Sequence, residues 1–158
     1  MKVALIMGSK SDYSKVEPAI LLLKSFNVEV SVRCFSAHRT PNELSEFVKE
    51  CNENGTEVII GAAGMAAALP GVIASLTVLP VIGLPISGSV LDGMDAFLSI
   101  AQMPPGIPVA TVAINGSKNA AYLALEILAI KYSDIKEKLL QEREQMRLAV
   151  LKANEEIQ

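Results

Sequence analysis

The chain has 158 residues, of which 51% are hydrophobic and 20% are charged, a composition that fits one folded domain and excludes a disordered chain. Lysine and arginine number 14 against 17 aspartate and glutamate, so the formal charge of −3 argues against a nucleic-acid partner. Aromatic residues make up only 4% and tryptophan is missing, so base-stacking surfaces are not expected.

The cysteines and the apolar segments predict the cellular compartment of the protein. Cys34 and Cys51 have neither metal-ligand nor disulfide spacing, so we expect no structural metal and a reduced, cytoplasmic protein. The apolar run before Gly8 is too short for a secretory signal. The uncharged stretch Val58–Leu91 is interrupted by many glycines and prolines, so we expect no membrane span.

The first half of the chain alternates between strand and helix patterns. Val3–Met7 is fully apolar and predicts a parallel strand that is buried on both faces. A helix with Asp12 as its N-cap and Pro18 near its first turn is expected next. Val28–Phe35 then predicts a second strand, and Pro41 opens the following helix.

The second half continues the alternation and ends in helix. Strands are predicted at Val58–Ile60, Val81–Leu84 and Val109–Ile114, and short helices at Val72–Leu76 and Asp95–Ala101. From residue 119 onward the chain has a helical pattern that is first apolar and then charged. This order predicts one three-layer α/β domain over residues 1–158, with a mainly parallel sheet and a long helical extension over 133–158.

Charge is unevenly distributed along the chain. Between Val58 and Ser117 only Asp92 and Asp95 are charged. A chain of this length cannot easily bury so long a segment, so part of its surface is expected to face other copies of the chain. The alternative is that the segment supplies only central strands and inward-facing helices.

Two of the loops that follow predicted strands carry polar side chains. In α/β sheets, ligands bind beyond the carboxyl ends of the strands. In the loop at residues 8–12, the hydroxyls of Ser9 and Ser11 and the N–H groups of a helix start suit an anion, and Asp12 suits sugar hydroxyls. A plain strand-to-helix turn explains this loop equally well. The loop at residues 36–41 contains His38, the single histidine and the natural acid or base near neutral pH, followed by Arg39.

The third loop, residues 61–71, consists almost entirely of small residues. Such residues either let a ligand approach the main chain or let a helix pack closely. The loop has neither the Lys of a phosphate-binding P-loop nor the spacing of a dinucleotide site.

Four segments, taken together, are more specific than any loop alone. They are MGSKSD (7–12), SAHRTP (36–41), ALPGVIASLTVLPVIGLP (68–85) and LSIAQMPPGIPVATVAI (98–114). In this order and spacing they resemble the PurE family of purine biosynthesis. The resemblance implies a flavodoxin-like fold, a homo-octamer and a ribonucleotide substrate. It also implies transfer of a carboxylate from the exocyclic nitrogen to C4 of an aminoimidazole ribonucleotide, without metal or cofactor.

The same resemblance assigns roles to residues of this chain. His38 matches the general acid and base. Ser9 and Arg39 match positions that bind phosphate, and Asp12 matches the position that binds ribose. Further substrate-binding positions are Ser11, Ser36, Ala37, Gly64 and Leu69.

The third loop departs from the family pattern, which usually reads GAGGAAHLPG. Here Ala68 stands at the position of the loop histidine, and Ala62 and Met65 replace two glycines. Three alternatives to the mutase therefore stay open. They are direct carboxylation of aminoimidazole ribonucleotide by CO2, a related carboxylase that acts on a pyridinium nucleotide, and a nucleotide-binding module without turnover. The presence of His38 favours an enzyme.

Overall fold

A single parallel sheet organises the computed structural model, which describes residues 1–88 and 90–157. Its strand order is β2-β1-β3-β4-β5, the order of flavodoxin-like folds, and this confirms the predicted α/β class. The strands are β1 (Lys2–Met7), β2 (Glu29–Cys34), β3 (Val58–Gly64), β4 (Val81–Ile86) and β5 (Ala110–Thr111).

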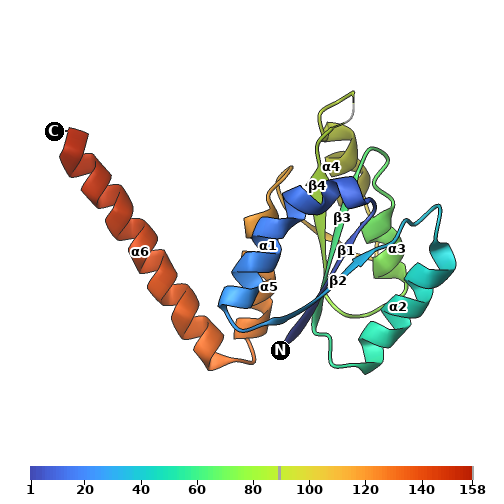
Figure 1. Ribbon diagram of the computed structural model, residues 1–158, viewed down its shortest axis with the longest axis horizontal. Helices are drawn as coiled ribbons and strands as arrows, with labels where there is room; N and C mark the ends of the chain where they lie inside the picture. The colour runs from blue at the N-terminus through green and yellow to red at the C-terminus, as the bar shows by residue number, and fades with distance from the viewer. Residues whose placement is uncertain (89, 158) are drawn as a thin grey trace.

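The helices cover the sheet on both faces (Figure 1). One face packs against α1, α5 and the start of α6, and the opposite face packs against α2, α3 and α4. The helices are α1 (Tyr13–Ser25), α2 (Pro41–Glu53), α3 (Leu69–Ser75), α4 (Met94–Ala101), α5 (Ser117–Ala129) and α6 (Ser133–Ile157). A short 3-10 turn, η1 (Lys10–Asp12), precedes α1.

The central strands contain long apolar runs because helices cover both of their faces. Along β1, Val3 and Leu5 belong to the cluster under α1 and α5, whereas Ala4 and Ile6 belong to the cluster under α2, α3 and α4. Successive side chains of a strand point to opposite faces, so a strand that is covered twice must be apolar at every position.

Helix α4 packs so closely on β4 that one strand position requires glycine. A Cβ atom added to Gly83 would lie 2.2 Å from Cγ2 of Ile100 and 2.8 Å from Cγ1 of Val109. Any side chain here would push α4 and the segment before β5 away from the sheet.

Two strand boundaries differ from the prediction. β3 extends four residues beyond Ile60, because the small residues Gly61–Gly64 continue in register with β4 instead of forming a loop. β5 is much shorter than Val109–Ile114. The carbonyl of Pro85 faces this edge and accepts a hydrogen bond from Asn115 N, and proline has no N–H to donate to the same side, so the ladder is interrupted there.

The helix boundaries also differ in detail. Pro18 lies in the second turn of α1, which starts at Tyr13, and α3 begins at Leu69, before the predicted Val72. The helical region from residue 119 divides at residues 130–132 into α5 and α6. None of the helices in the described part of the chain is both long enough and apolar enough to cross a membrane.

Helix α6 leaves the body of the molecule. Ile135 and Leu139 are buried near its start, whereas residues 143–157 are exposed and extend away from the sheet (Figure 1).

Candidate functional site

The segments that follow β1, β2, β3 and β4 surround one cavity of about 760 Å³. It lies at the carboxyl end of the sheet, where β1 is flanked by β2 and β3 and the direction of strand connection reverses. All nine residues selected from the sequence line this cavity. They are Ser9, Ser11, Asp12, Ser36, Ala37, His38, Arg39, Gly64 and Leu69.

The loop after β1 is held by its own hydroxyl groups. Ser9 adopts an extended conformation, and its Oγ accepts hydrogen bonds from Ser11 N at 3.3 Å and Ser11 Oγ at 2.8 Å. Ser11 Oγ also lies 3.4 Å from Oδ1 of Asp12. Ser9 therefore caps the 3-10 turn, whereas Asp12 occupies the N-cap position of α1 without a side-chain capping bond. This leaves the Asp12 carboxylate available to the cavity.

The loop after β2 is fastened to the end of β1 by Arg39. Arg39 Nη2 donates to Gly8 O at 3.2 Å, and Nε donates to Ser36 Oγ at 3.4 Å. Thr40 Oγ1 closes the same loop by accepting from Ser36 N at 2.8 Å. The guanidinium is thus placed beside the loop of Ser9, where both groups can reach one anion.

His38 lies on the same loop, lines the cavity and is exposed. Within the described residues no hydrogen bond to its imidazole is found, so no protein group fixes either ring nitrogen. The imidazole is therefore open to a ligand in the cavity, and the hydrogen bonds of a general acid or base commonly tighten only in the complex.

The segment after β3 combines small residues with an unusual backbone. A Cβ atom on Gly64 would lie 3.0 Å from Ile86 O, so this glycine serves the close pairing of β3 with β4 as well as lining the cavity. Met65 and Ala67 have φ values of 57° and 35°, in the left-handed region that costs a residue with a side chain about 1–2 kcal/mol. Met65 is 68% exposed. Ala68, which stands at the family's histidine position, also lines the cavity.

A fourth segment of the site was not predicted from the sequence. Lys15 lines the cavity, and its Nζ donates to Ser87 O at 2.6 Å and to Ser87 Oγ at 3.3 Å. Ser87 and Gly88 directly follow β4 and also line the cavity. The available signals were the position of Lys15 one helical turn beyond Ser11, and the carboxyl end of β4, to which the strand-end rule applies equally.

The cavity suits an anionic ligand. Its described lining contains two permanent cations, Arg39 and Lys15, and one carboxylate, Asp12. Burial raises the pKa of the Asp12 carboxyl above its usual value of 3.8, although the Lys15 ammonium and the Ser11 hydroxyl oppose that rise. The carboxylate is therefore held in the cleft at a cost to folding.

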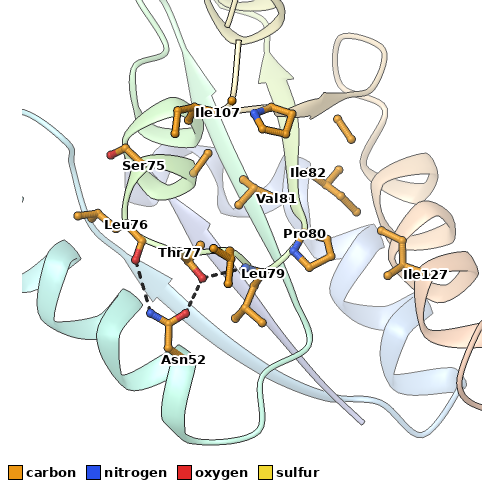
Figure 2. A pocket seen from close by; sticks show the side chains of 15 residues that line it. Asn52, Ser75, Leu76, Thr77, Leu79, Pro80, Val81, Ile82, Ile107 and Ile127 are labelled. Carbon is orange, nitrogen blue, oxygen red and sulfur yellow. Dashed lines mark hydrogen bonds between the residues drawn. The ribbon is translucent and has the colours of Figure 1, made fainter. Parts of the chain in front are cut away.

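A second and larger hollow, about 890 Å³, lies at the opposite end of the sheet (Figure 2). None of the described residues lining it is ionisable, and Val78, Leu79, Ile107 and Ile127 make much of it apolar. Its polar groups bond one another, since Thr77 Oγ1 donates to Asn52 Oδ1 and accepts from Leu79 N (Figure 2). This hollow offers surface for packing and no groups for proton transfer.

Fold and cleft together define a flavodoxin-like α/β protein whose switch-point cavity suits a phosphorylated small molecule. Comparison with known proteins narrows this class. The AIR carboxylase family matches residues 2–149, and the chain belongs to that family.

Named relatives cover most of the chain. An N5-carboxyaminoimidazole ribonucleotide mutase of Pyrococcus abyssi is 57% identical over 92% of this chain and 84% of its own length. A protein of the same name from Saccharolobus solfataricus is 53% identical over 95% of both chains. The crystal structure of Treponema denticola PurE has a TM-score of 0.91 and 28% identity, and the match covers 99% of this chain and 98% of that one.

The raised pKa of Asp12 predicts a stability effect with a definite sign. The folded chain binds this proton more tightly than the unfolded chain, so ionisation opposes folding above the usual pKa of 3.8. Asp12→Asn should raise the free energy of unfolding at neutral pH, and the gain should fade as the pH falls toward 3.8 and be absent below it. Urea unfolding at several pH values measures it, with Glu17→Gln on the exposed face of α1 as the control. A less stable Asp12→Asn protein at neutral pH would contradict this account.

Proposed function

We propose that this chain is an N5-carboxyaminoimidazole ribonucleotide mutase that acts in purine biosynthesis. It moves the carboxylate from the exocyclic nitrogen to C4 and so forms 4-carboxy-5-aminoimidazole ribonucleotide. One observation carries the proposal. In a chain that is 57% identical to a protein of that name, the single histidine, Arg39 and the Ser9 loop line the same cavity.

The binding roles follow the chemistry of each group. Ser9 and Arg39 hold the phosphate, because a guanidinium and neighbouring hydroxyls form charge-assisted hydrogen bonds to phosphate oxygens. Asp12 accepts hydrogen bonds from the ribose hydroxyls. The remaining contacts to the ribonucleotide come from Ser11, Ser36, Ala37, Gly64 and Leu69.

The reaction balances in protons without a net donor. When the bond between nitrogen and carboxyl carbon breaks, CO2 leaves and the nitrogen takes up one proton to become an amine. C4 of the electron-rich aminoimidazole then attacks CO2, and the new bond makes C4 lose one proton. The proton gained by nitrogen equals the proton lost by C4, so one group acting first as acid and then as base suffices.

His38 is the group we assign to both transfers. It is the only histidine of the chain, and Ala68 supplies no second imidazole where the family usually has one. The resemblance to the family also implies that neither a metal nor a cofactor takes part in the reaction.

The competing activity is direct carboxylation of aminoimidazole ribonucleotide by CO2. It stays an alternative because the segment from Met65 to Ala68 differs from the usual family pattern. Purified protein should convert the N-carboxylated ribonucleotide to the C4-carboxylated product. A parallel assay with aminoimidazole ribonucleotide and bicarbonate should be much slower at equal substrate concentration. The reverse order of rates would establish the carboxylase and overturn the mutase. Tight binding of both ribonucleotides with no turnover would instead favour a non-catalytic module.

Replacement of the histidine separates chemistry from binding. His38→Asn gives a smaller side chain that keeps one hydrogen-bonding nitrogen, but it cannot exchange a proton near neutral pH. We expect turnover to fall by about 10² or more while the dissociation constant of the product stays within a few fold. Steady-state kinetics and calorimetric binding give the two quantities. Equal turnover in wild type and variant would remove His38 from the mechanism.

We further propose that residues 1–158 form one domain that assembles as a homo-octamer in the cytoplasm, with residues 133–158 as a helical extension. Exposed apolar side chains and the hollow at the amino ends of the strands support contact between copies. The exposed residues within the nearly uncharged stretch are Met65, Val78, Val90, Leu91, Met94 and Leu98. The free thiols of Cys34 and Cys51 fit a reducing compartment.

Light scattering coupled to gel filtration tests the assembly. The expected mass is eight times the chain mass of 16.8 kDa. The variant Val78→Asp should shift the mass toward smaller species, because it introduces a carboxylate into the apolar hollow. A monomeric wild-type protein at micromolar concentration would contradict the octamer.

A further inference from the structure

The ammonium of Lys15 is the second cation that lines the cavity, and the proposed function assigns it no role. It projects from the first turn of α1, and its ammonium reaches across to the segment that follows β4, where Ser87 O and Ser87 Oγ accept its hydrogen bonds. An ammonium has three donor hydrogens, and among the described residues both of its bonds go to Ser87. One donor is therefore left for a ligand.

The space beside this ammonium is open. A Cβ atom added to Gly88 would lie 3.6 Å from Lys15 Nζ, so the absence of a side chain at Gly88 keeps one side of the ammonium clear. Lys15, Ser87 and Gly88 all line the cavity. The ammonium is thus held in place from one side and accessible from another.

The two cations mark different ends of the cleft. Arg39 Nη2 sits on Gly8 O just after β1, and Lys15 Nζ sits on Ser87 O just after β4. β3 lies between β1 and β4, so the two anchor points are two strand spacings apart, on the order of 10 Å. No single phosphate spans such a gap, whereas a ribonucleotide with a second anionic group on its base does.

The side chains between the cations follow the order of the parts of that ligand. Ser9 bonds Ser11, Ser11 lies within hydrogen-bond distance of Asp12, and the charge of Lys15 acts on the Asp12 carboxyl. If phosphate lies at Ser9 and ribose at Asp12, as in the proposed function on which this step rests, the base and its substituent lie toward Lys15.

We propose that Lys15 is a substrate-positioning residue that binds the carboxylate carried by the aminoimidazole. The carboxylate is charged in substrate and product but becomes neutral CO2 between them, so the ammonium stabilises the bound ribonucleotides more than the transition state. Its loss should therefore raise KM without lowering kcat.

Binding of three ligands tests the assignment. The C4-carboxylated product, aminoimidazole ribonucleotide without the carboxylate, and ribose 5-phosphate are titrated by calorimetry into wild type, Lys15→Met, Lys15→Arg and Lys24→Met. Lys24 lies on the same helix, is exposed and is not among the cavity-lining residues, so its replacement controls for net charge.

We expect Lys15→Met to bind the carboxylated product about 10-fold to 100-fold more weakly, the usual range for a lost hydrogen bond to a charged group. The other two ligands should change less than about threefold, Lys15→Arg should recover part of the loss, and Lys24→Met should match wild type. Unchanged binding of ribose 5-phosphate also shows that the cleft is intact.

Two results overturn the proposal and leave the mutase intact. Equal weakening for all three ligands would place the phosphate at Lys15, and no weakening for any of them would mean that Lys15 only fastens the segment after β4. Failure of wild type to bind the carboxylated product, in contrast, would reject the proposed function itself.

Discussion

The parallel pairing of β1 with both β2 and β3 is the constraint on which the site depends. β1 lies between β2 and β3, and α1 and α2, which connect these three strands, cover opposite faces of the sheet. All three strands are parallel, so the segments that follow them lie at the same edge. The single histidine and the paired serines are far apart in sequence. They line one cavity only because these three strands end in register.

The sequence predicted the parts of the molecule that this pairing determines. Fully apolar strands and amphipathic helices repeat along the chain, and their order specifies an α/β fold before any coordinates are considered. The loops after the first three strands were found by the same rule. The cavity includes every residue chosen from them, although their chemical roles stay predictions.

What the sequence did not predict depends on contacts between distant segments. Gly61–Gly64 looked like a loop, and its pairing with β4, and with β1 at Gly61 and Ala62, makes it strand. The short β5 follows from the missing N–H of Pro85, which lies on the neighbouring strand. The spacing of Lys15 from Ser11 hinted at its place in the cavity, but its contact with Ser87, 72 positions away, could not be predicted. Patterns of neighbouring residues in the sequence do not predict such distant contacts.

The exposed end of α6 would link the proposed assembly to secondary structure. Its last turns, from residue 143, have no buried side chain, and an isolated helix of about 15 residues is marginal in water. Any neighbour that covers this segment therefore supplies much of the free energy that keeps it helical. If copies of the chain cover it in the proposed assembly, dissociation by dilution should be accompanied by fraying of α6, and far-ultraviolet circular dichroism would then depend on protein concentration while the sheet remains intact.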